Sequence, residues 1–484
     1  MAPICNLIFV SVLIGVFSAC AQRPNQDGLL IDRAAVGVTA GAFLQVLDES
    51  GRAIADAEIL IGAREGYPFS DNHLHVDADG RVPAPTGWVN AEDVTIQAPG
   101  FVRLTRLREE AGEHSYRLKR ELTPATVLSG KTSGFGSLKT DGVLDVSLVF
   151  SALKKSDLPT LDLTRLLSPD VDKQSVYGQE IEMPSNLSIP SQTESVLLFV
   201  PVSLNKPRYR VALGGDGAAT KTVAAVAAQF DFKGMISDLQ DGKSFFDLIN
   251  RLKFKSYSVR SVAIAPVATP ITMDLPIGEV PLKSSVAVQT GVVPAGHAVI
   301  AAALTDHSGD LIVTDVKRLM ANEKKNLLAS YGGASTWVVR TLKKYEPTRV
   351  NFAGYDYEEL SSIVLPANQT PAEDFLPLIP PAETRGRSLI LRPPQVASSF
   401  VRTSTKVTLS RIEILSRESI DLVAKTPIWE FQSEGLISQI DLPKLANDPW
   451  AVKGRYRWEL QYSATPAGSE MPTHLSRNSI DFIF

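Results

Sequence analysis

The sequence predicts a mainly β protein, built from several β-sandwich domains in series with a few short helices in its middle region. Short runs of alternating apolar and polar residues recur along the chain, and turns rich in Asp and Gly separate many of them. The chain has 484 residues, more than one hydrophobic core usually organises, so we expect several domains. Its 44% hydrophobic and 21% charged residues are typical of a folded protein.

The N-terminus predicts export. An apolar run from Leu7 to Phe17 is too short to cross a bilayer as a helix but has the length of a signal-peptide core. Ser18 and Ala19 stand directly before Cys20, and this sequence resembles the lipobox of bacterial lipoproteins. The resemblance implies that the signal peptide, residues 1–19, is removed and that Cys20 is acylated with a fatty acid such as palmitate. Ordinary cleavage and an uncleaved anchor are the alternatives.

The residues after Cys20 extend this resemblance. Ala21 and Gln22 include no acidic retention signal, which implies a lipid anchor in the bacterial outer membrane. Residues 20–39 are then expected to be a lipidated tether, polar at first and without strong periodicity. Cys5 lies within the signal, so the body has no cysteine, no disulfide and no thiol nucleophile.

Residues 40–120 predict the first β-sandwich. A turn at residues 48–51 separates two alternating runs that we expect to form a hairpin, and a second turn follows at Asp77–Gly80. The stretches VLDESGRAIADAEILI, VDADG and VTIQAPGF resemble the carboxypeptidase regulatory-like, transthyretin-type β-sandwich module. That resemblance implies a fold and no catalytic residues, because such modules are accessory or adhesive units.

Residues 121–365 predict a mainly β middle region of one or two domains. Two segments there have helical spacing. In SFFDLINRLK, Ser244 is placed to cap a helix with Phe245, Phe246, Ile249 and Leu252 on its apolar face. The second predicted helix is TDVKRLMANEKKNLLASYGG, residues 314–333, which would end at Gly332 and Gly333.

Five prolines between Pro366 and Pro381 predict a linker at residues 366–388, because proline interrupts both helices and strand ladders. Residues 389–484 follow as a last β-sandwich. Its run RYRWELQYSA, with Tyr456, Trp458, Leu460 and Tyr462 alternating, resembles a core strand of a fibronectin type III or immunoglobulin-like domain.

Several partner classes are disfavoured by the sequence. There are 49 basic and 53 acidic residues, and the basic ones are dispersed, so we expect no nucleic-acid partner. The stretch ATVLSGKT, residues 125–132, matches a loose phosphate-binding pattern, but the turn-rich SGFGSLKTDG follows where a helix would be needed. We therefore expect no nucleotide and no cofactor.

Serine-hydrolase chemistry is also disfavoured. Ser151 with Lys154, and Ser203 with Lys206, have the spacing of a Ser–Lys pair, but both lie in β-like sequence. The triplet Ser70–Asn72 precedes these pairs, whereas the penicillin-binding family places such a triplet after them.

A metal site is the sharpest chemical hypothesis. His73, His75, Asp77 and Asp79 occupy alternate positions and would share one face of a strand, where imidazole and carboxylate groups could hold zinc if another segment completed the shell. The alternative is a solvated hairpin face that ends in its Asp-Gly turn.

Two further acidic groups have ordinary explanations. The cluster of Asp306, His307 and Asp310 beside Gly309 reads as a hairpin turn between apolar strands. Paired acids for glycoside hydrolysis could come from Asp356, Glu358 and Glu359, with a solvated edge as the default.

These observations predict a non-catalytic lipoprotein that binds, adheres or acts as an envelope scaffold, with an envelope protein or glycan as partner. The alternative is a secreted hydrolase acting on glycan or peptidoglycan through carboxylates that the fold brings together. A purely structural spacer is the third possibility.

Overall fold

The computed structural model describes residues 41–483, except 122, 136–142, 156–157, 159–160, 162, 164–170, 177–178, 190–205, 207, 216–219, 232–233, 235–237, 239–248, 265–268, 332–334, 345–356, 372–373, 417–421 and 446–452. Within this part of the chain the mainly β prediction is confirmed, since the regular elements are strands and one 3-10 turn. The signal segment, the tether and Cys20 lie outside the described residues.

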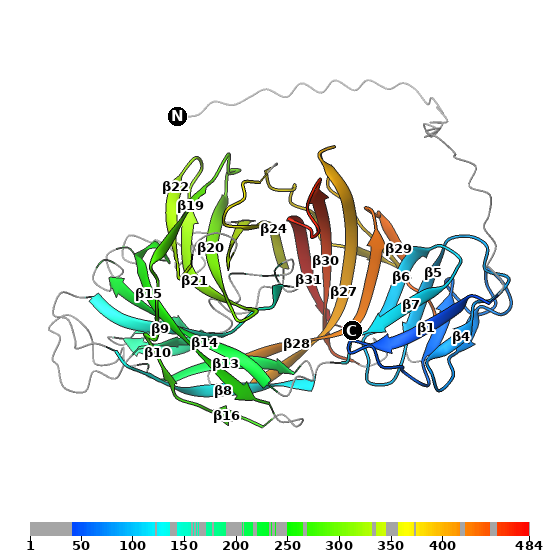
Figure 1. The fold of residues 1–484 in the computed structure, drawn as a ribbon, viewed down its shortest axis with the longest axis horizontal. Helices are drawn as coiled ribbons and strands as arrows, with labels where there is room; N and C mark the ends of the chain where they lie inside the picture. Colours follow the sequence, from blue (N-terminus) through cyan, green and yellow to red (C-terminus); the bar gives the residue numbers. More distant parts are fainter. Residues whose placement is uncertain are drawn as a thin grey trace, which may run out of the picture. The chain divides into compact units, whose positions relative to one another are not determined.

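The N-terminal strands enclose one core between two sheets (Figure 1). One sheet has the order β4-β1-β7, and the strands facing it have the order β3-β2-β5-β6. Their bounds are β1 Phe43–Asp48, β2 Glu58–Ile61, β3 His73–His75, β4 Arg81–Pro83, β5 Glu92–Gln97, β6 Arg103–Glu109 and β7 His114–Leu118. The predicted β1–β2 hairpin is wrong, because the two strands lie in opposite sheets. Val46 of β1 and Ile59 of β2 are both buried in the core between these two sheets.

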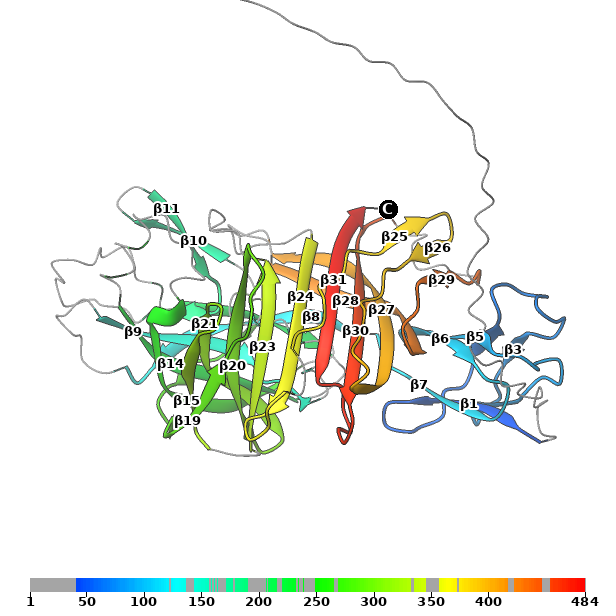
Figure 2. The ribbon, with the colours of Figure 1, turned by 90° about the horizontal axis from the view of Figure 1, so that it is seen from above.

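A twelve-stranded sheet crosses the predicted domain boundaries. Its order is β21-β20-β23-β24-β31-β30-β27-β28-β6-β5-β2-β3, and Figure 2 shows β23, β24, β31 and β30 side by side. The strands not yet given are β20 His297–His307, β21 Asp310–Leu319, β23 Thr336–Lys344, β24 Tyr357–Pro366, β27 Phe400–Ser416, β28 Leu422–Glu434, β30 Arg455–Pro466 and β31 His474–Ile483. Strands from the N-terminal, middle and C-terminal parts of the chain therefore pair in one sheet.

The junction between the N-terminal strands and the rest is a parallel pairing of β6 with β28. Trp429 faces Arg103 in this register and is fully buried. Its indole N–H donates to Thr105 Oγ1 at 2.9 Å, and the Arg103 guanidinium lies 4.6 Å from the ring centre. Lys119 also reaches Glu430, with Nζ 3.2 Å from Oε1. Main-chain pairing and buried side chains thus make this junction a continuous sheet.

The middle region holds two further sheets with a shared core. Their orders are β12-β9-β14-β15-β18 and β13-β8-β16, and β17 also pairs with β8. The bounds, with a separate β10–β11 pair and the 3-10 turn η3, are β8 Thr123–Ser133, β9 Val143–Ser151, β10 Val171–Val176, β11 Gln179–Pro184, β12 Leu187–Ser188, β13 Arg208–Gly215, β14 Thr220–Asp231, η3 Ile249–Arg251, β15 Leu252–Ala263, β16 Ile271–Thr272, β17 Leu275–Pro276 and β18 Val280–Pro281.

Strand β14 shows why the sequence of this region contains long runs of apolar residues. Val223 and Ala225 face the core shared with β8 and β13, whereas Ala224 and Val226 face a second core shared with β20 and β21. A strand buried on both faces needs no polar positions. The run of Ala and Val in β14 therefore marks the central layer of three.

The second predicted helix is wrong. Residues 314–319 belong to β21, and Lys324–Ala329 form β22. Because β21 is buried on both faces, its apolar residues match a helical period by accident. A turn follows β21, with Asn322 in the left-handed region at φ 58°. Gly332 and Gly333 lie outside the described residues.

The first predicted helix is only partly described. Ser244, Phe245 and Phe246 lie outside the described residues, η3 is a single short turn, and Leu252 already begins β15. No helix in the described ranges is long and apolar enough to cross a membrane.

The Pro-rich segment predicted as a linker packs onto the large sheet. Leu376 and Ile379 are buried, and the main-chain oxygens of this segment accept hydrogen bonds from β31. Ser476 Oγ donates to Pro377 O at 2.7 Å, and Asn478 Nδ2 donates to Ile379 O at 2.6 Å. The segment thus covers β31 and does not separate two domains.

The segment leads into a small sheet that closes the C-terminal core. Its order is β25-β26-β29, with bounds β25 Glu383–Arg385, β26 Ser388–Ile390 and β29 Gln439–Asp441. The predicted core strand RYRWELQYSA is confirmed as part of β30. Tyr456, Trp458, Leu460 and Tyr462 are all buried in one cluster, and Tyr462 Oη donates to Ile437 O at 2.8 Å.

A carboxylate–imidazole pair makes stability depend on pH. Glu109 Oε1 lies 3.1 Å from His114 Nδ1, and this hydrogen bond raises the pKa of His114 above its ordinary 6.5. Burial would raise the pKa of Glu109, but His114 and Arg106 outweigh burial and hold that pKa below 4.5. The stability from His114 is lost as pH rises through its raised pKa, and that from Glu109 is lost as pH falls through its lowered pKa.

We therefore expect this pair to stabilise the fold most between about pH 4.5 and 6.5. Denaturant unfolding at pH 5.5 and 8.5 should show a smaller pH difference in the free energy of unfolding for His114→Gln than for the wild type. The exposed His75→Gln is the matched control. Equal pH differences for wild type and His114→Gln would contradict the assignment.

Candidate functional site

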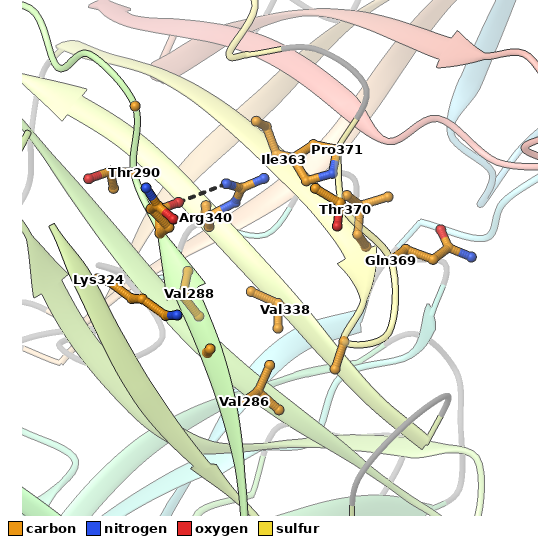
Figure 3. A pocket seen from close by; sticks show the side chains of 15 residues that line it. Val286, Val288, Thr290, Lys324, Val338, Arg340, Ile363, Gln369, Thr370 and Pro371 are labelled. Atoms are coloured by element: carbon orange, nitrogen blue, oxygen red, sulfur yellow. Dashed lines mark hydrogen bonds between the residues drawn. The ribbon is translucent and has the colours of Figure 1, made fainter. Parts of the chain in front are cut away.

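A groove of about 450 Å³ lies between a two-stranded sheet and the large sheet (Figure 3). The two-stranded sheet is formed by β19, Ser284–Gln289, and β22, Lys324–Ala329. Residues 286–291 form one wall, β23 and β24 form the floor, and residues 367–371 form the opposite wall. Its volume falls in the range of small-molecule and peptide sites.

The sequence of β19 explains how the first wall is placed. SSVAVQ alternates, so Val286 and Val288 are buried while Ser285, Ala287 and Gln289 are exposed. Val288 packs with Leu327 of β22 against Val299 and Leu342 of the large sheet. This core holds β19 beside β23 and β24. In the described part of the chain, β22 is the one strand that pairs with β19.

The floor is apolar with one cation. Val338 and Arg340 of β23 stand opposite Leu365 and Ile363 of β24 in the sheet register. Figure 3 shows Val338 and Ile363 beside Val286, Val288 and Arg340 around the same space. The floor therefore suits an apolar side chain, with a charged group at the Arg340 end.

Among the residues that the structure describes, Arg340 and Lys324 are the cations that line the groove, and no carboxylate is among its lining residues. Arg340 Nη1 donates to Gln289 O at 3.1 Å. Burial lowers the pKa of Arg340 and the charge of Asp374 raises it, but a guanidinium stays protonated at neutral pH. Lys324 is exposed at the end of β22. The groove therefore presents positive charge above an apolar floor.

The four predicted metal ligands are not brought together as a shell. Of the four, only His73 and His75 lie on strand β3, and their ring centres are 5.2 Å apart. Asp77 belongs to the next turn, where its Oδ1 accepts from Asp79 N at 2.9 Å and Arg81 N at 2.8 Å. Across the residues that the structure describes, no group of three His, Cys, Asp or Glu is placed to hold a metal ion.

The predicted hairpin turn at Asp306–Asp310 is confirmed. It joins β20 to β21 through Ser308 and Gly309, both in the left-handed region. Asp306 Oδ1 accepts from Gly309 N at 2.8 Å. Asp306 also lies 2.9 Å from Lys155 Nζ, whose hydrogen bond lowers the pKa of this carboxyl. The cluster is thus a charged turn.

The described residues of the patterns that resemble catalytic motifs lie in strands or next to them. Residues 125–132 lie within β8, so the phosphate-binding pattern has no loop around it. Ser151 ends β9, and Lys154 pairs with Asp310. Lys206 is buried and donates to three main-chain oxygens, those of Ser185, Leu187 and Arg208. Ser203 lies outside the described residues.

The remaining candidates are Ser70–Asn72 and the acids of β24. Asn72 is buried, where its amide binds the main chain of residues 61–67. Glu359 Oε1 lies 3.6 Å from His297 Nε2, and Glu358 is on the same strand. Asp356 lies outside the described residues. None of these groups lines the groove.

Sequence reasoning missed the groove, although one signal was present. The alternating run SSVAVQ was readable as a strand. Nothing in it shows that β22, 40 residues further along by number, becomes its partner. The residues that matter, Arg340 and Lys324, are ordinary cations in the sequence.

The fold and the groove define the class of this protein as a mainly β chain with an open strand beside a cationic groove. No family model and no curated protein sequence matches it. The major pilin protein of Streptococcus pyogenes aligns at 8% identity and a TM-score of 0.11, over 65% of this chain and 99% of its own. Escherichia coli alpha-2-macroglobulin activated by porcine elastase aligns at 10% identity and a TM-score of 0.13, over 91% of this chain and 42% of its own. Such scores carry no argument about function.

Proposed function

We propose that this chain is a non-catalytic binding protein of the bacterial envelope, which holds a ligand in the groove beside β19. The groove is the observation that carries the proposal, because it combines an apolar floor, an open strand edge and two cations. Few, well-placed polar groups above an apolar surface are typical of binding sites. The lipobox-like sequence before Cys20 supports lipid anchoring in the outer membrane, and adhesion or scaffolding is the corresponding role.

The hydrolase alternative has less support. Glycoside hydrolysis needs two carboxylates about 5–10 Å apart around the scissile bond. The described residues of the groove lining include none, and the nearby Asp374 accepts a hydrogen bond from Phe375 N at 2.9 Å. The ordered apolar floor is also better suited to holding a ligand than to activating water. Binding is therefore the function that the geometry supports best.

The test is capture of envelope components by three forms of the full chain, purified in detergent, with cross-linking and mass spectrometry. Lys324→Glu reverses a charge in the groove and should reduce recovery of the specific partner about tenfold, as loss of one favourable charge contact would. Lys453→Glu makes the same change at an exposed site outside the groove and should not alter recovery. Equal recovery by all three forms, or no specific partner, would refute the proposal.

A further inference from the structure

We infer that the groove binds an extended polypeptide segment, which adds as a strand to the open edge of β19 and places an acidic side chain near Arg340 and Lys324. The inference rests on the proposed binding function and names its ligand class. Strand addition to a sheet edge is a recurrent mode of peptide recognition, in which main-chain hydrogen bonds supply affinity and pockets select side chains.

The pairing of β19 with β22 shows to which side each residue of β19 directs its N–H and C=O groups. Thr290 N donates to Glu323 O at 3.0 Å, one step beyond the β19–β22 register. Hydrogen-bonded and non-hydrogen-bonded pairs alternate along an antiparallel ladder. Val288 and Val286 therefore direct their main-chain groups towards β22, as Thr290 does.

The alternate residues of β19, which are Ser285, Ala287 and Gln289, direct their main-chain groups away from β22. Ala287 and Gln289 line the groove on this side. The Gln289 carbonyl supports this parity, because it accepts from Arg340 Nη1 on the groove side. No strand of the described ranges pairs with this edge, so Ser285 and Ala287 offer N–H and C=O groups at the spacing of an antiparallel partner.

The edge also lacks the usual protection. Exposed edge strands normally carry Lys, Pro or a bulge that prevents pairing. Between Ser284 and Gln289 there is neither Lys nor Pro, and the register with β22 is regular. An added strand would run over the Val338 and Leu365 side chains of the floor. The edge of β19 is therefore suited to pairing with an added strand.

The charge of the groove selects the ligand. Arg340 and Lys324 both line it, none of the described lining residues is a carboxylate, and Asp374 is the acid whose charge acts on Arg340. The described lining therefore carries two positive charges, one of which Asp374 partly offsets. An acidic side chain on the bound segment would complement it. A glycan would match the floor less well and would not match a row of main-chain groups.

The probe is a fluorescein-labelled hexapeptide with alternating valines and one glutamate, titrated with the full chain and read by fluorescence anisotropy. We expect saturable binding. Methylating the peptide amides that face β19 removes donors but no side chain, and should weaken binding about tenfold or more. Replacing glutamate by lysine in the peptide should weaken binding by a similar factor.

The matched protein variants are Ala287→Pro and Ala287→Val. Proline removes the groove-facing N–H without removing a β22 bond and should weaken peptide binding about tenfold, whereas valine retains the N–H and should weaken binding much less than proline does. Lys324→Glu should restore affinity for the lysine peptide. Thermal unfolding verifies that each variant is folded.

The outcomes separate this inference from the proposed function. Weaker binding upon amide methylation, together with charge-swap rescue, supports strand addition of an acidic segment. Equal binding of the methylated peptide, or no peptide binding while envelope capture still depends on Lys324, overturns the inference and leaves the binding function standing. Loss of both capture and peptide binding refutes both.

Discussion

Replacing Trp429 by alanine is expected to lower the free energy of unfolding by about 3–5 kcal/mol, as truncation of a buried tryptophan does. The side chain is fully buried at the β6–β28 junction. It stacks on Phe431 with ring centres 4.6 Å apart, lies under the Arg103 guanidinium and donates to Thr105. Alanine would leave a cavity and remove all three contacts at once.

The measurement is chemical denaturation followed by far-UV circular dichroism, with hydrogen exchange on the strands. Exchange should increase first at residues 103–106, which pair with β28 at Trp429. Trp429→Phe is the matched control, because it retains an aromatic ring and loses the indole donor, for about 1 kcal/mol. A loss below about 1 kcal/mol for the alanine variant would show that Trp429 does not hold the junction.

Replacing Asn72 by alanine is expected to cost about 2–4 kcal/mol, because its amide supplies two N–H donors and one acceptor, each worth about 0.5–1.5 kcal/mol. Its two Nδ2 hydrogens are shared among the carbonyl oxygens of Ile61 at 2.6 Å, Arg64 at 2.8 Å and Tyr67 at 2.6 Å, and its Oδ1 accepts from Gly66 N at 2.8 Å. The side chain is fully buried. One amide thus organises the loop that follows β2.

Denaturant unfolding and limited proteolysis test this expectation. Cleavage within residues 62–71 should accelerate in Asn72→Ala. Asn72→Asp has nearly the same shape but presents oxygen where Nδ2 donates, so it should be at least as destabilising. The exposed neighbour Asp71→Asn is the matched control and should be close to neutral. If Asn72→Asp behaved like wild type, the donor role of Asn72 would be wrong.

Local sequence patterns predicted much of the fold. The alternation of Tyr456, Trp458, Leu460 and Tyr462 identified the core strand, because side chains of a strand point alternately to two faces. The turn at Asp306–Asp310 was readable because Gly309 tolerates its left-handed geometry and the Asp306 carboxylate accepts a main-chain N–H within the turn. Such features depend on neighbours in the chain.

The helix predicted at residues 314–333 shows where this reasoning stops. Val316 and Leu319 fit a helical period, but they lie on β21, where both faces are buried and every position is available to apolar residues. Periodicity distinguishes helix from strand only when one face is solvated. Burial on both faces is a property of the three-layer packing.

The prediction of a linker at residues 366–388 failed for a related reason. Prolines indicate that residues 366–388 lack a long helix or strand, and most of that segment indeed forms neither. They do not indicate whether the segment is free or packed. The hydrogen bonds from Ser476 and Asn478 to its carbonyl oxygens, about 100 residues away along the chain, determine that it covers β31.

The sequence by itself determined the mainly β class, several turns and the C-terminal core strand, because strand alternation and turn geometry are properties of adjacent residues. Only the tertiary structure decided that one sheet runs from β21 to β3, and that β22 is the one described strand that pairs with β19, which lies beside Val338 and Arg340. Strand pairing joins residues that are distant in sequence, and its register depends on which faces the whole fold buries. The candidate site is a product of that pairing.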